Sequence, residues 1–333
     1  MQVLVTGATG YVGSRLVSAL LDAEQTVVAT ARNLERLRGI DWADQVQALA
    51  LDVLDPESVR AALARCGPVD VAYYLVHALG EGDYESSDER AAGIFAVAAA
   101  EAGVGRIVYL GGLIPDEPEV SAHLRSRARV GEVLAAGTVD TVLLRAAVIL
   151  GAGSTSFEII RHLVDRLRIV PLPPFMDHQV QPIAIADVLH YLVAAADPDV
   201  LPGGVYDIVG DERTTYAGLA RIYAATAGRR RVFLPVPFVP PRFAAAVMGP
   251  LLPVPTGLVT DLVQSLANSM VGTDRRIEEF VEPPFGGLAG IEEAIHRALD
   301  RYGQTPVGRV GVRQLPDPMA LADSDAEWAG GRT

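Results

Sequence analysis

The chain has 333 residues, a formal net charge of −13 and a hydrophobic fraction of 50%. This length and apolar content suit a doubly wound sheet with a modest second lobe and a large buried core. The negative charge disfavours direct binding to nucleic acid, because the protein repels the phosphate backbone. Cys66 is the only cysteine, so no intrachain disulfide can form, which suits a reducing cytosol.

The chain starts directly with a strand pattern, without a basic region or a cleavage site, so we expect no signal peptide and a cytoplasmic location. Residues 232–259 are apolar, but repeated prolines interrupt them, which argues against a membrane-spanning helix. The apolar segment 232–270 is interpreted instead as a surface for a homodimer contact or another protein partner.

Short apolar runs alternate with helical patterns over the first 145 residues. Predicted strands cover residues 3–5, 26–30, 46–51, 69–76, 106–110 and 141–145. Predicted helices lie between them, around residues 12–20, 56–64, 86–102 and 123–135. The alternation predicts parallel β-α-β units with right-handed crossovers, and therefore an α/β fold with a Rossmann doubly wound parallel sheet.

Beyond residue 150 the alternation weakens, which predicts a smaller C-terminal substrate-capping lobe at the ligand-binding edge of the sheet. Its predicted elements are helices 157–166, 186–196, 216–226 and 291–302, with strands 181–185 and 205–209. The plausible pocket residues of this lobe are Phe157, Phe175, Met176, His178 and Gln181.

The polar, patternless end of the chain is expected to be mobile. The predicted domains are therefore a dinucleotide-binding domain (1–150), a capping lobe partly interleaved with the sheet (151–303) and a mobile tail (304–333).

The strongest local signal is the glycine motif Thr6-Gly7-Ala8-Thr9-Gly10-Tyr11-Val12-Gly13, between the first strand and the first helix. Gly7 allows the tight turn out of the strand, Gly10 lets the backbone approach a pyrophosphate, and Gly13 lets the helix pack against the sheet. The helix N-terminus offers free N–H groups and a partial positive charge to the phosphates. The motif predicts a dinucleotide site; a glycine-rich turn without a ligand is the alternative.

The end of the second predicted strand distinguishes between the two nicotinamide cofactors. An NAD site normally has an acidic residue there, whereas this chain has Arg32. A guanidinium at this place can hold a 2′-phosphate with two hydrogen bonds, with help from Arg15 and Arg36. The sequence therefore favours NADP(H) over NAD(H), unless Arg32 is an ordinary surface arginine.

Further cofactor contacts are expected where the third and fourth strands end. Asp52 can accept a hydrogen bond from the adenine amino group, or can simply close a turn. Leu75, Val76 and His77 are expected beneath the cofactor ribose. The predicted cofactor-binding residues are Gly7, Thr9, Gly10, Tyr11, Val12, Gly13, Arg32, Asp52, Val53, Leu75, Val76, His77, Gly111 and Arg127.

These segments together resemble the short-chain dehydrogenase/reductase superfamily, in its atypical or extended NmrA-like branch. The resemblance covers about residues 1–300. Besides the glycine motif, it rests on YYLVHAL (73–79), DERAAGIFAVAAAEAGVGRIVYLGGL (88–113), LRSRARVGEVL (124–134), LRAAVILGAGSTSFEII (143–160), QPIAIADVLHYL (181–192) and YDIVGDERTTYAGLARIYAATAG (206–228). It implies an NAD(P)H-binding oxidoreductase without naming a substrate.

Active members of that superfamily use a Ser, a Tyr and a Lys four residues after the Tyr, with the Tyr as acid/base. Here Gly111 and Gly112 stand where the Ser is expected, Arg127 aligns with the Lys and His123 with the Tyr. The triad is therefore absent. His123 and Arg127 are the candidate catalytic pair, because a histidine can donate a proton near neutral pH; a solvated histidine at a helix start is the alternative.

Other candidates near strand ends are Tyr73, Tyr74, Tyr109 and His77, with at least one of the adjacent tyrosines expected in the core. The six histidines have no partners at metal-ligand spacing, so no metal site is predicted.

The sequence leaves three functions open. The first is an NADP(H)-dependent oxidoreductase that reduces a small apolar acceptor, a quinone or a carbonyl. The second is a non-catalytic NADP(H)-binding redox sensor that acts through a protein partner, which the missing triad favours. The third, a sugar-nucleotide epimerase or dehydratase, needs the Tyr-Lys pair and ranks last.

Overall fold

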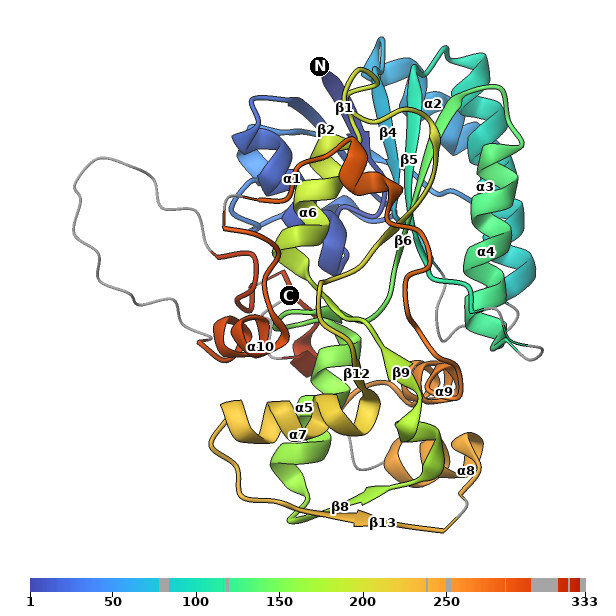
Figure 1. Cartoon of the computed structure of the whole chain (residues 1–333). Coiled ribbons are helices and arrows are strands. Elements are labelled where there is room, and N and C mark those ends of the chain that lie inside the picture. Colours follow the sequence, from blue (N-terminus) through green and yellow to red (C-terminus); the bar gives the residue numbers. More distant parts are fainter. Residues whose placement is uncertain are drawn as a thin grey trace.

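A seven-stranded parallel sheet forms the centre of the computed structural model (Figure 1). The structure describes residues 1–77, 84–115, 117, 120–237, 239–249, 253–284, 286–300, 317–322 and 324–329. The strands are β1 (Gln2–Val5), β2 (Thr26–Ala31), β3 (Gln47–Ala50), β4 (Val71–Tyr74), β5 (Arg106–Gly112), β6 (Asp140–Ala146) and β11 (Gly204–Ile208). Their order, β11-β6-β5-β4-β1-β2-β3, is that of a Rossmann sheet, which confirms the predicted fold class.

Helices cover both faces of the sheet because its central strands are apolar on both sides. The helices are α1 (Tyr11–Asp22), α2 (Pro56–Cys66), α3 (Tyr84–Glu101), α4 (Ala122–Ala135) and α6 (Ile185–Ala194). In β1, Val3 and Val5 join the core under α1 and α6, whereas Leu4 joins the core under α2, α3 and α4. Strand alternation thus divides the buried side chains into two cores (Figure 1).

The second lobe lies beyond the carboxyl ends of the strands (Figure 1). Its elements are α5 (Thr155–Arg166), β8 (Ile169–Leu172), α7 (Tyr216–Thr226), β13 (Val232–Pro235), α8 (Pro241–Met248) and α9 (Thr256–Ser265). Short strands β7 (Ile149–Leu150), β9 (Gln179–Val180), β10 (Ile183–Ala184) and β12 (Thr214–Thr215), and helix α10 (Ile291–Leu299), connect the parts. Short 3-10 helices are η1 (Leu34–Leu37), η2 (Ala43–Gln45), η3 (Pro174–Asp177), η5 (Arg276–Glu279) and η6 (Glu327–Ala329).

The proline-rich segment contains helices that the sequence analysis missed. Pro241 stands at the start of α8, where a missing N–H costs nothing and a fixed φ favours the helix. The prolines therefore begin and separate short helices rather than exclude them. Among the described residues, no helix combines the length and the apolar content that crossing a membrane requires.

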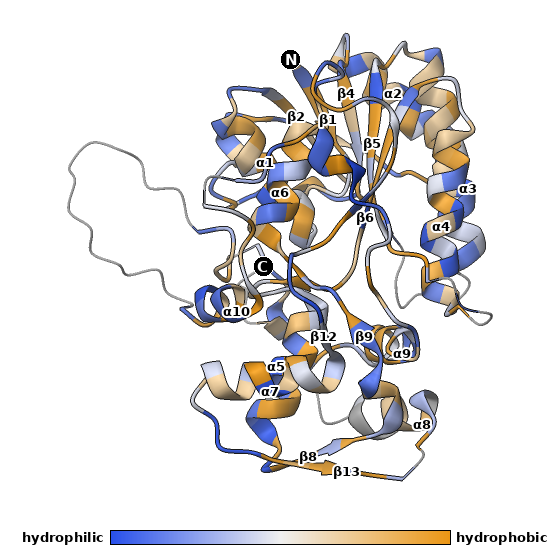
Figure 2. Cartoon of the chain, viewed as in Figure 1, coloured by the Kyte–Doolittle hydropathy of each residue, from blue (hydrophilic) through white to orange (hydrophobic). Residues whose placement is uncertain are grey.

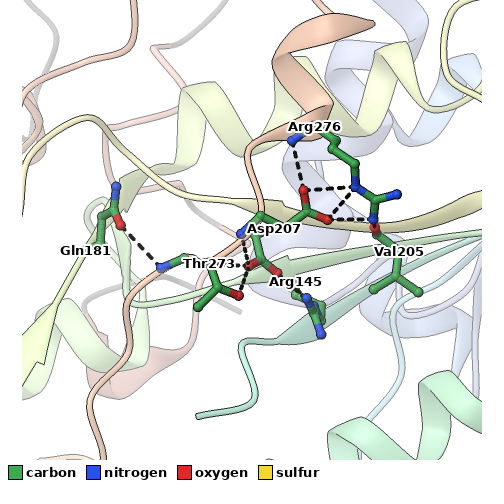
Figure 3. Close-up of polar contacts among 8 residues, drawn as sticks. Arg145, Gln181, Val205, Asp207, Thr273 and Arg276 are labelled. Atoms are coloured by element: carbon green, nitrogen blue, oxygen red, sulfur yellow. Dashed lines mark hydrogen bonds and ion pairs between the residues drawn. The ribbon is translucent and has the colours of Figure 1, made fainter. Parts of the chain in front are cut away.

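The chain returns from the lobe to the edge of the sheet through a set of buried polar contacts (Figure 3). Asp207 of β11 pairs with Arg145 of β6 at 2.7 Å and accepts a hydrogen bond from the Thr273 amide at 2.9 Å. Gln181 donates to the Gly210 carbonyl and accepts from the Gly272 amide, so it joins two backbone segments and is not free to contact a ligand. The prediction of Gln181 as a pocket residue is therefore corrected.

The end of the chain differs from the predicted mobile tail. Residues 304–316, 323 and 330–333 lie outside the described residues, but residues 317–322 and 324–329 pack on the protein. Met319 is fully buried, and its carbonyl accepts a hydrogen bond from the Ala152 amide at 3.0 Å. Asp325 forms a buried ion pair with Arg15 of α1 at 2.6 Å. We call residues 317–329 the C-terminal strap.

Candidate functional site

The glycine loop between β1 and α1 is shaped so that side chains cannot replace its glycines. Gly7 has φ +68°, and a Cβ atom there would lie 2.7 Å from the Leu75 carbonyl oxygen. A Cβ atom on Gly13 would lie 2.2 Å from the Gly7 carbonyl oxygen. Both glycines are thus required by close backbone approach, as the motif predicts.

The first turn of α1 presents its backbone N–H groups to the cavity described below. Gly10 is the N-cap residue and supplies no side chain to bond these groups. The N–H groups of the first turn have no partner inside the helix, so they can hold a phosphate at the positive end of the helix dipole. This open helix start fits a cofactor pyrophosphate.

One cavity of about 930 Å³ extends from the glycine loop into the second lobe. Its polar end is lined by Gly7, Gly10, Tyr11, Val12, Gly13, Arg36, Leu75, His77, Gly111, Gly112, His123 and Arg127. Its apolar end is lined by Ile159, Ile160, Leu163, Pro171, Phe175, Met176, Val236, Val239, Phe243, Leu258, Leu262, Val263, Leu266 and Met270. A dinucleotide and an apolar molecule can therefore share one continuous space.

Arg127 supplies the most distinctive polar atom of the cavity wall. Its side chain packs beside Gly112, where an added Cβ would lie 3.5 Å from the Arg127 Cδ. Its Nε is buried and has no hydrogen-bond partner among the described residues. Burial lowers the pKa of the guanidinium, opposed by Tyr109 and Asp88. A buried donor without a partner is costly, so this nitrogen fits a ligand oxygen such as a ribose hydroxyl or phosphate.

His77 lines the cavity and belongs to a buried polar cluster. Its Nε2 is 3.2 Å from the Tyr109 hydroxyl, which also bonds the Arg127 carbonyl, and its Nδ1 is 3.4 Å from Asp88 Oδ2. Burial and the Arg127 charge lower the pKa of His77 to about 4, despite the nearby Asp88 carboxyl. The Ser126 hydroxyl donates to the same Asp88 oxygen at 3.3 Å. The sequence analysis missed Asp88, which has no motif of its own.

His123 lies at the cavity but is not the solvated histidine of the alternative interpretation. It is 7% exposed, and burial together with Arg127 lowers the pKa of its imidazole to about 2. His123 is therefore neutral near pH 7, which makes it a weaker proton donor than a histidine of ordinary pKa. A neutral imidazole can still form hydrogen bonds with a ligand.

Because His77 and His123 are buried, we predict that the folded protein loses stability as the pH falls. The unfolded chain protonates histidine below about pH 6.5, whereas the folded protein does so only near about pH 4 at His77 and about pH 2 at His123. The unfolded state binds more protons in this window, so stability is full above about pH 6.5. Below about pH 6.5, the free energy of unfolding falls by up to about 1.4 kcal/mol for each histidine and each unit by which the pH is lowered. Denaturant unfolding between about pH 7 and about pH 5 measures the slope.

His123→Gln should reduce this slope, whereas His296→Gln, at an exposed position of α10, should not. If the free energy of unfolding has the same pH dependence in the wild type, His123→Gln and His296→Gln, the neutral, buried state of His123 is contradicted.

The arginines predicted around the 2′-phosphate lie in different environments. Arg36 lines the cavity. Arg32 is exposed directly after β2 and makes no ion pair within the described part of the chain. Arg15 does not assist them, because both of its terminal nitrogens donate to Asp325. Its Nη1 also donates to the Tyr11 carbonyl, and its Nη2 to the carbonyls of Ala152 and of Ala320 in the C-terminal strap. The expectation for Arg15 is therefore corrected.

The remaining predicted residues lie around the cavity rather than on its wall. Asp52 accepts a hydrogen bond from the Leu54 amide at 3.0 Å, as the turn interpretation expects. Val53 belongs to the core under α2 and Val76 packs against it, while Thr9 is half-buried in the glycine loop. Tyr73 and Tyr74 are both core residues, at 0% and 1% exposure.

In the second lobe, Phe175 and Met176 line the cavity as expected. Phe157 instead packs edge-on against Tyr223 in the core, and His178 Nδ1 lies 3.1 Å from the Leu266 carbonyl oxygen. Within the described ranges, no group of three or more His, Cys, Asp or Glu side chains could hold a metal ion.

The chain matches a known protein family. A family model described as NAD(P)H-binding matches residues 7–191, which is more than half of the chain. An uncharacterized protein of Mycobacterium tuberculosis is 29% identical over 234 residues, 70% of this chain and 24% of that protein. The chloroplastic divinyl chlorophyllide a 8-vinyl-reductase of Zea mays is 35% identical over 143 residues, 40% of this chain and 35% of the enzyme. The chain thus spans about a quarter of the length of its mycobacterial relative.

Solved structures share the fold at low sequence identity. An NADPH-dependent quinone oxidoreductase of Escherichia coli has a TM-score of 0.70 at 16% identity, covering 90% of this chain and 100% of its own. The Citrobacter sp. triphenylmethane reductase complexed with NADP(H) has a TM-score of 0.67 at 20% identity, with the same coverage. The family model confirms the NAD(P)H-binding domain, and these structures confirm the Rossmann-type fold.

Proposed function

The chain belongs to the NAD(P)H-binding family, and from that premise we propose that it is an NADP(H)-dependent oxidoreductase that reduces a small apolar acceptor, a quinone or a carbonyl compound. The observation that carries this proposal is the continuity of the cavity from the glycine loop to the apolar walls of α5, α8 and α9. An acceptor held against those walls would share one continuous space with a cofactor bound at the glycine loop.

The cofactor end of the site has a residue for each charged part of NADP(H). The open first turn of α1 holds the pyrophosphate, and Arg127 bonds a ribose hydroxyl or a phosphate through its unpaired Nε. Arg32 and Arg36 hold the 2′-phosphate, since both follow β2 and no acidic residue stands between Ala31 and Leu34. NADPH, when bound, supplies a hydride to the acceptor.

The cavity wall favours an acceptor that needs little help from a protein acid. His123 is neutral near pH 7 and the superfamily's Tyr-Lys pair is missing. The reduced oxygen of a quinone is a much weaker base than the alkoxide formed from a ketone, so it draws less on a proton donor. The quinone oxidoreductase and triphenylmethane reductase of similar fold agree with an apolar acceptor.

A second candidate is a redox sensor that binds NADP(H) without turnover and acts through a protein partner. The observation that favours it is the same neutral His123 beside Arg127, which leaves no acid/base pair at the place of the family triad. Both functions require tight cofactor binding, so binding alone does not separate them. Turnover does, because only the oxidoreductase oxidises the cofactor with an acceptor.

Fluorescence titration with NADPH and NADH tests the cofactor site. We expect the wild type to prefer NADPH, and Arg32→Asp to weaken NADPH binding by about tenfold to a hundredfold with little effect on NADH. Arg65→Asp, at an exposed position of α2, should leave both affinities unchanged. Equal affinities for the two cofactors in the wild type would contradict the preference for NADP(H).

The same cuvette then tests the reaction. A panel of quinones and carbonyl compounds is added and the absorbance of reduced cofactor is followed. Acceptor-dependent oxidation supports the enzyme; tight binding without oxidation across the panel supports the sensor. Failure to bind either cofactor would overturn both functions.

A further inference from the structure

A two-stranded ribbon at the far end of the second lobe is apolar on both of its faces. Its parallel strands β8 and β13 pair Ile169 with Val232 and Pro171 with Leu234, so these four side chains share one face. The opposite face packs inward through Val170 and Leu172. On the outer face Ile169, Val232 and Leu234 are 58%, 60% and 50% exposed. We call this outer face the apolar ribbon.

Arginines collect at the N-terminal ends of both ribbon strands. Arg168 precedes Ile169 and Arg231 precedes Val232, and the Val232 amide bonds the Arg168 carbonyl at 3.0 Å, so the two ends lie side by side. Figure 2 shows hydrophilic colour in the segment that leads into β13 and hydrophobic colour in β13 itself. The ribbon therefore has a basic end and an apolar body, in a protein with a net charge of −13.

Most of this positive charge is not neutralised by nearby carboxylates. Asp165 pairs with Arg229 at 3.0 Å, and this is the one ion pair that the residues 229–231 make within the described chain. The Arg231 guanidinium bonds backbone carbonyls instead, and Arg168 and Arg230 make no ion pair with the described residues. This arginine cluster therefore offers an anion several uncompensated positive charges.

A second cavity lies at the basic end of the ribbon. It has a volume of about 440 Å³ and is lined by Arg221, Arg229, Arg230, Arg231, Val232 and Phe233, with Ala224 and Ala225 of α7. Four arginines thus line this pocket beside Val232 and Phe233, and among them Arg230 makes no ion pair with the described residues. Positive charge next to apolar side chains matches a phosphate group attached to a hydrocarbon.

The main cavity reaches the surface close to the same ribbon. Pro171 of β8, Val236 just after β13 and Phe243 of α8 line the main cavity, and Phe243 is 61% exposed. The apolar end of the main cavity therefore borders the ribbon.

We propose that the apolar ribbon and its arginine cluster form a docking surface for an anionic lipid membrane, with lipid phosphates in the arginine-lined cavity and the ribbon side chains among the acyl chains. Apolar side chains bordered by arginines are the composition that binds the interface of an anionic bilayer. A second copy of the chain is a poorer occupant, because its matching face carries the same uncompensated positive charge.

Vesicle flotation of the full chain tests the surface. We expect binding to vesicles with about a third phosphatidylglycerol in phosphatidylcholine, little binding to phosphatidylcholine alone, and loss of binding at high salt. The paired variant Val232→Ser/Leu234→Ser, and separately Arg230→Glu, should each weaken binding at least about tenfold. The melting temperature should change little, since these side chains are exposed.

Matched controls are Val97→Ser, 54% exposed on α3, and Arg65→Glu on α2, which should bind like the wild type. Absence of binding at low salt, or equal losses in controls and ribbon variants, would overturn the proposal. Inorganic phosphate that binds the wild type and the ribbon variant equally, and displaces the vesicles, would show a free-anion site instead. A dimer in sedimentation that the ribbon variant dissociates would assign the face to a second copy.

Discussion

Gly13→Ala is expected to weaken NADPH binding by about a hundredfold or more. The added Cβ would lie 2.2 Å from the Gly7 carbonyl oxygen and 2.9 Å from its carbon, so the glycine loop must move away from α1. That movement displaces the N–H groups of the first turn from the pyrophosphate. Losing two hydrogen bonds to a charged group, at about 1.5–3 kcal/mol each, corresponds to this change in affinity.

Gly93→Ala in helix α3 is the matched control, because the added Cβ would meet only the side chain of Val133 in α4, at 3.9 Å. Alanine in a helix should preserve NADPH affinity and raise stability slightly. Fluorescence titration measures the affinity, and circular dichroism checks that both variants fold. A Gly13→Ala protein that is folded and binds NADPH as tightly as the Gly93→Ala control would show that the glycine loop does not hold the cofactor.

Asp325→Asn is expected to lower the free energy of unfolding by about 3–5 kcal/mol. The two Asp325 oxygens bond Arg15 at 2.6 Å and 2.8 Å, and the side chains are only 1% and 5% exposed. Removing the carboxylate leaves a buried guanidinium without its counter-charge, which costs far more than the loss of an exposed pair. The melting temperature should fall by about 4–7 °C for a chain of 333 residues.

Asp317→Asn is the control in the same segment, since its pair with Arg297 is about one third exposed. It should cost only about 1 kcal/mol. The double variant Arg15→Met/Asp325→Leu removes both charges and should recover most of the lost stability. Equal effects of Asp325→Asn and Asp317→Asn in thermal unfolding would contradict the docking of the C-terminal strap on α1.

The local patterns of the sequence predicted the elements around the cofactor end of the site closely. The glycine motif, the helix after it and the strand ends near Leu75 and Gly111 all lie where periodicity and glycine spacing placed them. Alignment with the superfamily also placed Arg127 and His123 at the cavity. The motif succeeds because neighbouring residues alone determine a tight turn and a helix start.

The chemistry of the same residues was less predictable. The pKa of a histidine depends on its surroundings: burial removes water from His123, and the positive charge of Arg127 disfavours a second positive charge on its imidazole. No residue near His123 in the sequence carries that information. Likewise, the contacts of His77 with Asp88 and Tyr109 join the loop after β4 to α3 and β5, which lie apart in the sequence.

The sequence by itself therefore determined the parallel Rossmann sheet, the alternation of strands and helices along the first 145 residues, and the glycine loop, since these follow from short-range periodicity and backbone geometry. Only the tertiary structure decided which charges are buried, paired or free. Arg15 and Asp325 meet across 310 residues, and Arg168 meets Arg231 because β8 and β13 pair in register. Burial and long-range contact set the energy of a charge, and neither is a property of a local segment.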